Sequence, residues 1–193
     1  MEQMSQWYTQ LEQVKQYLLV KDPVLKSVFD TVDQSGFQLH TVVKDPYTAL
    51  IGAIIGQKIS YQNAKRLRSQ LYARYGNILI PTQIQNADLS FLGSVPAQII
   101  TNVTNYIILN NIDLNTEEGI RLLEIVNGIG PWTIETTLLV CLKHWDIFPA
   151  GDKFIQERMR RLYGSLDKSN MITITSNWAP FRSVVTWYLW RWF

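Results

Sequence analysis

A stretch of seven residues, Asn127-Gly-Ile-Gly-Pro-Trp-Thr133, separates two segments that have the sequence pattern of helices. Gly130 and Pro131 are typical of the cap and first residue of the second helix, and Asn115 with Glu118 indicates a capping pair for the first. Glycine tolerates backbone conformations closed to other residues and exposes the main chain, so the stretch predicts a tight hairpin whose N–H groups favour an anion. An isolated Gly-x-Gly is more often a plain turn between packed helices, so the residues that follow must decide.

Helical patterns extend along the rest of the chain. Apolar residues four, three and four positions apart form one helical face near its start: Trp7, Leu11, Val14 and Leu18. The pairs Asp22-Pro23 and Asp45-Pro46 each combine a helix N-cap with proline at the first helical position. Strand-like alternation does not persist, so the sequence predicts an all-α fold. The helices expected after the second pair are 46–55, a basic helix ending at Gly76, and segments near 82–92, 96–109, 116–126, 131–144, 153–163 and 178–192.

The composition excludes several classes of protein. With 193 residues, 47% of them hydrophobic and 18% charged, the chain is expected to form one compact globular domain. Its single cysteine, Cys141, excludes an internal disulfide, a multi-cysteine zinc site and an iron–sulfur cluster. The sequence has no signal-peptide pattern and no membrane-spanning run, so we expect an intracellular protein without a membrane partner. We also expect the protein to be a monomer. A net charge of +2 does not by itself indicate a nucleic-acid partner.

The hairpin and the loop that follows it resemble a known signature. The segment 123–133 followed by Phe148-Pro-Ala-Gly-Asp152 is similar to the hairpin, Gly/Pro-rich loop and catalytic aspartate of the helix-hairpin-helix DNA glycosylase superfamily. In its 3-methyladenine DNA glycosylase II branch the aspartate follows the first hairpin glycine by about two dozen residues, and here Asp152 follows Gly128 by 24. The resemblance extends to the segments 50–60 and 178–183, and to Trp190.

This resemblance implies an all-α fold of two helical lobes with the active cleft between them. The whole chain, 1–193, would be a single glycosylase domain. Residues 1–44 would form the N-terminal helices of one lobe, 45–145 the central helices with the hairpin at 127–133, and 146–193 the catalytic loop and C-terminal helices. With 193 residues the chain is similar to the shorter members, because it has no room for the extra N-terminal domain of the bacterial inducible enzymes.

The resemblance identifies Asp152 as the catalytic carboxylate. Cleavage of an N-glycosidic bond builds positive charge on the deoxyribose, and a fixed anion lowers the free energy of that transition state. The same carboxylate can orient or deprotonate the attacking water. An aspartate that precedes a helix is ordinarily an N-cap, and the two roles do not exclude each other.

Three residues are implied to form the pocket for the damaged base. Trp132 stands where lyase-competent relatives carry a lysine, and tryptophan has no amine for a Schiff base, so the strand should stay uncut. Its indole face would attract a purine made cationic by alkylation. Trp190, eight residues after Arg182, matches the tryptophan that stacks on the flipped base. Thr136 stands where those relatives have a tyrosine, which predicts a roomier or differently shaped pocket. Core packing is the alternative for both tryptophans.

The remaining implied contacts concern the DNA backbone. Gln57-Lys58-Ile59-Ser60 resembles the turn that wedges a side chain into the gap left by the flipped nucleotide. Relatives place an apolar side chain at the position of Lys58, so a solvated surface lysine is the alternative there. The predicted DNA contacts are Gln57, Lys58, Gly128, Gly130 and Thr133. Lys65, Arg66 and Arg68 of the basic helix are candidates for phosphate contacts, and a solvated helix face is the favoured alternative for any single one of them.

No cofactor is expected to be required for the reaction. Hairpins of the family bind a monovalent cation through main-chain carbonyls, which implies Na⁺ or K⁺ at the carbonyl oxygens of Glu124, Val126 and Ile129. His40 and His144 have no metal-ligand or triad partners at a useful spacing.

Together these residues predict a DNA glycosylase of base excision repair that acts on double-stranded DNA. It would flip out alkylated purines, 3-methyladenine and also 7-methylguanine, and hydrolyse the N-glycosidic bond without lyase activity. The first alternative is a glycosylase for oxidised or mismatched purines, which the missing hairpin lysine and the single Cys141 disfavour. The second is a non-catalytic hairpin module that holds DNA, which Asp152 disfavours because a pure binder needs no carboxylate near the DNA backbone.

Overall fold

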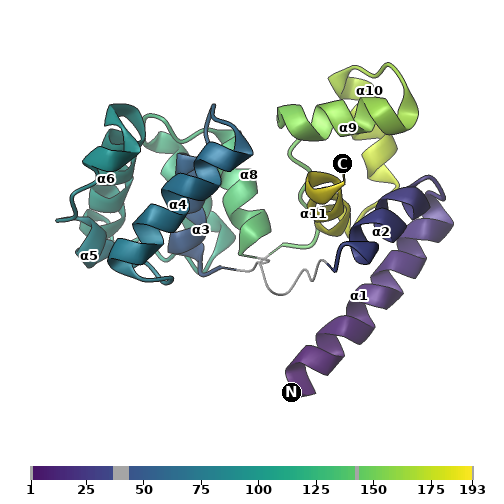
Figure 1. Ribbon diagram of the computed structural model, residues 1–193, viewed down its shortest axis with the longest axis horizontal. Coiled ribbons are helices and arrows are strands. Elements are labelled where there is room, and N and C mark those ends of the chain that lie inside the picture. Colours follow the sequence, from purple (N-terminus) through teal and green to yellow (C-terminus); the bar gives the residue numbers. More distant parts are fainter. Residues whose placement is uncertain (1, 37–43, 142–143, 193) are drawn as a thin grey trace. The chain divides into compact units, whose positions relative to one another are not determined.

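The computed structural model describes residues 2–36, 44–141 and 144–192, with side chains from residue 10 onward. Within these ranges the chain forms eleven α-helices and two short 3-10 helices, and no β-strand (Figure 1). The predicted all-α class is therefore confirmed. The described residues divide into two compact units, as expected for two lobes: unit 1 takes its residues from 1–43 and 144–193, and unit 2 from 44–143.

Unit 1 is built around its last helix. Its helices are α1 (Glu2–Lys21), α2 (Leu25–Gln34), α9 (Lys153–Tyr163), α10 (Lys168–Ser176) and α11 (Arg182–Arg191). Helix α11 packs against α2 and α9, and every residue from Ser183 to Leu189 is buried. A helix that is buried on all sides needs neighbours on all sides, which explains why both ends of the sequence contribute to this unit.

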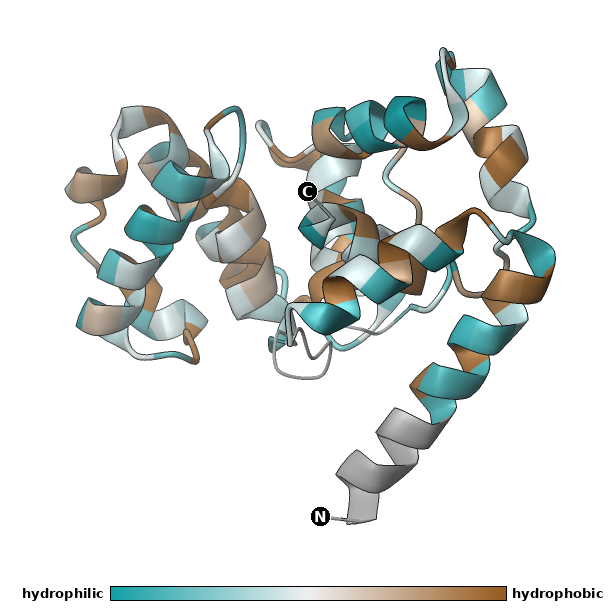
Figure 2. Cartoon of the chain, turned by 45° about the vertical axis from the view of Figure 1, so that its right-hand side comes forward, coloured by the Kyte–Doolittle hydropathy of each residue, from teal (hydrophilic) through white to brown (hydrophobic). Residues whose placement is uncertain are grey.

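Unit 2 is built around its first helix. Its elements are α3 (Pro46–Ile55), α4 (Tyr61–Tyr75), α5 (Pro81–Ile84), η2 (Ser90–Leu92), α6 (Ser94–Leu109), α7 (Glu117–Arg121), η3 (Leu122–Ile125) and α8 (Pro131–Val140). Helix α3 packs against α4, α6 and α8, and all its residues from Tyr47 to Ile55 are buried. Figure 2 shows mixed polar and apolar residues along α4, as expected for a surface helix.

Most predicted helices are present, with corrections at several boundaries. The segment 82–92 is not one helix, because Asp88 accepts a bond from the backbone N–H of Ser90 and turns the chain between α5 and η2. The segment 131–144 ends as a helix at Val140, and the segment 178–192 becomes helical only at Arg182. Helix α10 was not predicted, although Asp167 and Asn170 form the capping box that could have identified it.

Three of the five predicted N-caps are correct: Asp45, Gly130 and Asp152, the last of which is described with the site below. The Asp45 carboxylate accepts a bond from Thr48 N–H at 3.0 Å, with Pro46 at the first helical position. Gly130 likewise caps α8 ahead of its proline. Asn115 is not the cap of α7, because the adjacent Thr116 hydroxyl accepts the bond from Gly119 N–H at 3.0 Å.

Asp22 is the other incorrect cap, because α2 begins only at Leu25. The side chain of Asp22 is buried and serves two distant residues. One carboxylate oxygen accepts bonds from the Tyr163 hydroxyl at 2.6 Å and from the Trp178 indole N–H at 2.9 Å. Asp22 therefore joins α1 to the C-terminal part of unit 1.

The apolar face predicted for the first helix is confirmed where its side chains are described. Leu11, Val14 and Leu18 of α1 are buried, whereas Trp7 lies among residues whose side chains are not described. Across the described residues, no helix combines the length and the apolar character that a membrane crossing requires.

Candidate active site and nucleic-acid interface

The hairpin between η3 and α8 has the geometry expected from its glycines. A bond from Ile129 N–H to the Val126 carbonyl oxygen, 3.0 Å long, closes the turn. Gly128 has φ of +93°, and a Cβ atom there would lie 2.7 Å from two side-chain atoms of Ile99. A Cβ atom on Gly130 would meet no described atom within 4 Å. The protein's own packing thus requires glycine at the first position, whereas at the second it leaves the backbone open to a ligand.

Gln57 connects the predicted wedge turn to this hairpin. Its side-chain amide nitrogen donates to the Gly128 carbonyl oxygen at 2.9 Å and to the Thr133 hydroxyl at 2.8 Å. Thr133 is buried, and its hydroxyl accepts a hydrogen bond from Gln57 within the protein. The turn and the hairpin therefore form one continuous surface of unit 2.

Lys58 occupies the exposed position of that turn. Its φ of +57° is uncommon for a residue with a side chain, and the side chain is exposed. The next helix, α4, is capped by the Ser60 hydroxyl, which accepts a bond from Asn63 N–H at 3.3 Å. Lys58 is therefore presented outward immediately before a helix N-terminus, a position that suits contact with a phosphate or with a gap in the duplex.

The basic residues of α4 divide into two groups. Lys65 and Arg66 are exposed. Arg68 is half-buried and donates to the Gly52 carbonyl oxygen at 3.2 Å, and the Arg74 guanidinium stacks over the Phe91 ring at 4.0 Å. Lys65 and Arg66 are thus the members of the predicted phosphate contacts that the structure leaves at the surface.

The predicted cation site consists of three main-chain carbonyl oxygens. The Val126 carbonyl oxygen already accepts the turn-closing bond from Ile129, and Glu124 lies within the 3-10 helix η3. A carbonyl oxygen has a second lone pair, so the three oxygens fit a monovalent cation chemically, and the site stays a prediction. In the described ranges, no three His, Cys, Asp or Glu side chains are grouped to hold a metal ion. His40 lies outside the described residues.

Trp132 and Thr136 lie one turn apart on α8. Trp132 is half-buried, and its ring lies near α3, since a Cβ atom on Gly56 would be 3.8 Å from Trp132 Cη2. Thr136 is 8% exposed, and its hydroxyl has no hydrogen-bond partner among the described residues. The neighbouring Thr137 is also buried, but its hydroxyl donates to the Thr133 carbonyl oxygen at 2.7 Å. A buried hydroxyl without a partner costs about 1 to 3 kcal/mol, which singles out Thr136 on this helix.

Asp152 lies in unit 1, at the start of α9. It is 5% exposed, and its Oδ1 atom accepts bonds from Phe154 N–H at 2.8 Å and Ile155 N–H at 3.0 Å. The predicted capping role is therefore confirmed, and two bonds fix the orientation of the carboxylate. Its catalytic role stays a prediction.

Trp190 also belongs to unit 1. It is half-buried and packs edge-to-face on Trp187, with ring centroids 5.3 Å apart at 85°. Trp178, Trp187 and Tyr188 are buried, so these aromatic side chains form part of the core of unit 1. Trp190 is thus partly accessible to a ligand and packs against a buried tryptophan.

The loop before Asp152 contains contacts that the sequence did not predict. Arg182 and Ser183, which open α11, bond to several residues of this loop. The segment 178–183 was part of the family resemblance, but no role could be assigned to these two residues from the pattern alone. Their partners lie nearly forty positions earlier in the chain.

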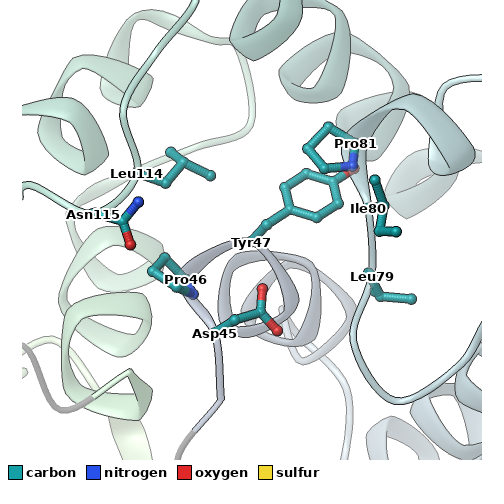
Figure 3. Close-up of a pocket in the computed structure, with 8 residues that line it drawn as sticks. All are labelled: Asp45, Pro46, Tyr47, Leu79, Ile80, Pro81, Leu114 and Asn115. Atoms are coloured by element: carbon teal, nitrogen blue, oxygen red, sulfur yellow. The ribbon is translucent and has the colours of Figure 1, made fainter.

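A pocket of about 270 Å³ in unit 2 lies apart from these residues (Figure 3). Its lining includes Asp45, Tyr47, Pro81 and Asn115, and none of the predicted site residues. It adjoins the first turn of α3, whereas the Gln57 turn follows the other end of this ten-residue helix, roughly 15 Å away. Burial raises the pKa of the Tyr47 hydroxyl, which bonds to Thr104 at 2.7 Å and so stays protonated.

Comparison with known proteins agrees with the sequence signature. No protein-family model matches the chain. DNA-3-methyladenine glycosylase 1 of Schizosaccharomyces pombe is 27% identical over 165 residues, which cover 77% of this chain and 72% of that protein. The structure of the 3-methyladenine DNA glycosylase of the same yeast, in complex with abasic DNA, aligns with a TM-score of 0.66 at 26% identity, covering 76% of this chain and 80% of the other.

A second solved structure extends the agreement in fold. The DNA-3-methyladenine glycosidase of Bacillus halodurans aligns with a TM-score of 0.65 at 22% identity, over 92% of this chain and 87% of that one. The similarity therefore includes most of both units. By sequence and by fold, the chain is similar to DNA-3-methyladenine glycosylases.

Proposed function

We propose that this protein is a monofunctional DNA glycosylase that hydrolyses the N-glycosidic bond of 3-methyladenine in double-stranded DNA. The observation that carries the proposal is Asp152, a buried carboxylate oriented by two backbone N–H groups at the position of the family's catalytic aspartate. The relationship to the yeast enzyme, whose name states this activity, supports the substrate. We extend the proposal to 7-methylguanine, which N-alkylation also makes cationic.

The proposed reaction needs a carboxylate, a held backbone and a pocket for the base. Asp152 stabilises the positive charge that develops on the deoxyribose as the bond breaks, and it orients the attacking water. The hairpin holds the DNA backbone. Within the described residues α8 begins without a side-chain cap, and Gly130 is open, so a phosphate can approach the positive end of the helix. Trp132 and Trp190 stack on the flipped purine.

The products provide the direct test. Incubation with methylated duplex DNA is expected to release 3-methyladenine and 7-methylguanine as free bases and to leave alkali-sensitive abasic sites in an uncut strand. The reason is Trp132, which replaces the amine of the lyase-competent relatives. Chromatography of the released bases and a denaturing gel with and without alkali make the measurement.

Borohydride gives the control for the same prediction. A covalent protein–DNA adduct trapped by borohydride would contradict the monofunctional mechanism, because only an amine nucleophile forms a reducible Schiff base. Release of oxidised or mismatched purines in place of methylated ones would contradict the proposed substrate and favour the first alternative, a glycosylase for those purines. Tight DNA binding without release of any base would favour the non-catalytic module.

A second prediction follows from the Thr136 hydroxyl, which has no hydrogen-bond partner among the described residues. If it bonds to the flipped base, Thr136→Val should slow excision roughly fivefold to thirtyfold, since one hydrogen bond is worth about 1 to 2 kcal/mol. The thermal midpoint should stay equal or rise, because valine removes a buried hydroxyl that no described residue satisfies. Single-turnover rates and thermal melts measure the two effects.

Thr137→Val is the matched control for this variant. It makes the same substitution at the next position of α8, where the hydroxyl is bonded within the helix. We expect it to leave the excision rate unchanged. Equal rates for Thr136→Val and the wild type would remove Thr136 from the proposed base pocket.

A further inference from the structure

We propose that Arg182 and Ser183, at the start of α11, are positioning residues that hold the loop carrying Asp152. Residues 144–151 form this loop, which we name the Asp152 loop. The inference rests on the proposed function, because it concerns how the catalytic carboxylate is kept in place. All the contacts that support it lie within unit 1.

Ser183 bonds to three parts of the loop. It is 1% exposed, its hydroxyl donates to the His144 carbonyl oxygen at 2.8 Å, and the same oxygen accepts from Ile147 N–H at 2.9 Å. Its backbone N–H donates to the Trp145 carbonyl oxygen at 2.8 Å. The loop is irregular and its residues from Ile147 to Ala150 are buried, so its backbone groups lack the regular hydrogen bonds of a helix. The bonds to Ser183 satisfy some of these groups.

Arg182 adds a planar ion pair on the outer side of the same loop. Its Nε and Nη2 atoms donate to the two carboxylate oxygens of Asp146 at 2.6 and 2.8 Å. This bidentate geometry fixes direction as well as distance, which a single contact from a lysine would not do. Hydrogen bonding to the Arg182 guanidinium lowers the pKa of Asp146, and the carboxylate raises the pKa of Arg182 in return. Both groups therefore stay charged at neutral pH.

The far end of the loop is held by α9, the helix that Asp152 caps. The Gln156 side-chain amide donates to the Ala150 carbonyl oxygen at 2.8 Å, and Asp152 N–H donates to the Pro149 carbonyl oxygen at 2.8 Å. The loop is thus fixed to α11 at its start and to α9 at its end. If the start of the loop moved, the Asp152 carboxylate would move as well. The segment between Ser183's partners and Asp152 is short, and the Asp152 backbone is bonded to Pro149 within that segment.

The expected effect is on the chemical step and not on stability. About one third of each partner's side chain in the Arg182–Asp146 pair is exposed, and such pairs contribute little to folding. Catalysis is more demanding, because a displacement of about 1 Å at the reacting groups can cost on the order of a hundredfold in rate. Loss of this ion pair should therefore change Tm very little and lower the excision rate clearly.

The experiment compares Asp146→Ala, Arg182→Ala and the double variant with the wild type. Single-turnover excision of 3-methyladenine at saturating enzyme gives the rate, binding to an abasic-site duplex gives Kd, and a melt gives Tm. Each single variant should be roughly tenfold to a hundredfold slower, with Kd within about twofold and Tm within roughly 3 °C of the wild type. Because both act through one anchor, the double variant should be no slower than either single variant.

The experiment includes two controls. The first excludes a charge effect on DNA binding, and the second excludes a general effect of losing a surface carboxylate. Asp146→Ala and Arg182→Ala change the net charge in opposite directions, so a charge effect on DNA would change their Kd values in opposite directions, whereas lost anchoring slows both. Asp30→Ala is the matched control, since it removes the carboxylate of the exposed Lys26–Asp30 pair elsewhere in unit 1. It should leave the rate unchanged.

Three outcomes overturn the inference. Wild-type rates in both single variants, or losses that multiply in the double variant, would show that the pair does not hold the Asp152 loop for catalysis. So would a fall in Tm without a change in rate, which is the signature of a purely structural contact. A wild-type protein that releases no methylated base would instead overturn the proposed function.

Discussion

Replacement of Asp152 by asparagine is expected to reduce base release by on the order of a hundredfold to a thousandfold or more, while the fold stays intact. The carboxylate charge that stabilises the deoxyribose cation is lost, and an amide cannot replace it. The capping bonds survive, because the asparagine side-chain oxygen can accept from Phe154 N–H and Ile155 N–H as Asp152 Oδ1 does, and asparagine is an equally good N-cap. Binding to abasic duplex DNA should stay equal or become tighter, since one repulsion from the phosphates is removed.

Asp152→Ala is the matched variant that separates the two roles of this residue. It removes the charge and the cap together, so it should be as slow as Asp152→Asn and also lose about 1 kcal/mol of stability. Single-turnover rates beside thermal midpoints measure both effects. If Asp152→Asn excises at the wild-type rate and only Asp152→Ala is impaired, Asp152 is a helix cap and the carboxylate for the reaction must be sought elsewhere.

The two hairpin glycines are expected to differ in what their replacement costs. Gly128→Ala should destabilise the protein by about 1 to 3 kcal/mol and lower Tm by roughly 3 to 10 °C, because a side chain must adopt φ near +93° and displace Ile99. Gly130→Ala should leave Tm nearly unchanged, because its φ of −114° suits any residue and no described atom lies within 4 Å of the new Cβ. The affinity of the Gly130→Ala variant for duplex DNA should fall roughly tenfold, because the new methyl group lies where a phosphate would approach the backbone.

Gly164→Ala provides the control for strain alone. Gly164 has φ of +84°, and a Cβ there would meet no described atom within 4 Å, so any loss beyond that of Gly164→Ala measures the overlap with Ile99. Thermal melts and DNA titrations of the three variants complete the comparison. If Gly130→Ala binds DNA as tightly as the wild type, the open face of the hairpin is not where the backbone approaches.

The amino-acid sequence determined the features that depend on neighbouring residues. The 3.6-residue spacing of Leu11, Val14 and Leu18 gave a helix face, and Asp45-Pro46 and Gly130-Pro131 marked two helix starts correctly. Asp152 was identified with both of its roles in view, and the capping role is confirmed. These signals are readable because each is completed within about four residues along the chain.

Only the tertiary structure decided the contacts between residues that are distant in sequence. Gln57 holds Gly128 and Thr133 from more than seventy residues away, Asp22 reaches Tyr163 and Trp178 across 141 and 156 residues, and Ser183 holds Ile147 across 36. No local pattern specifies such pairs, because they exist only once the helices have packed and buried polar groups must find partners. The same reason explains why the two hairpin glycines looked alike in the sequence: only the packing of Ile99 against one of them distinguishes a glycine that the fold requires from one that it leaves open.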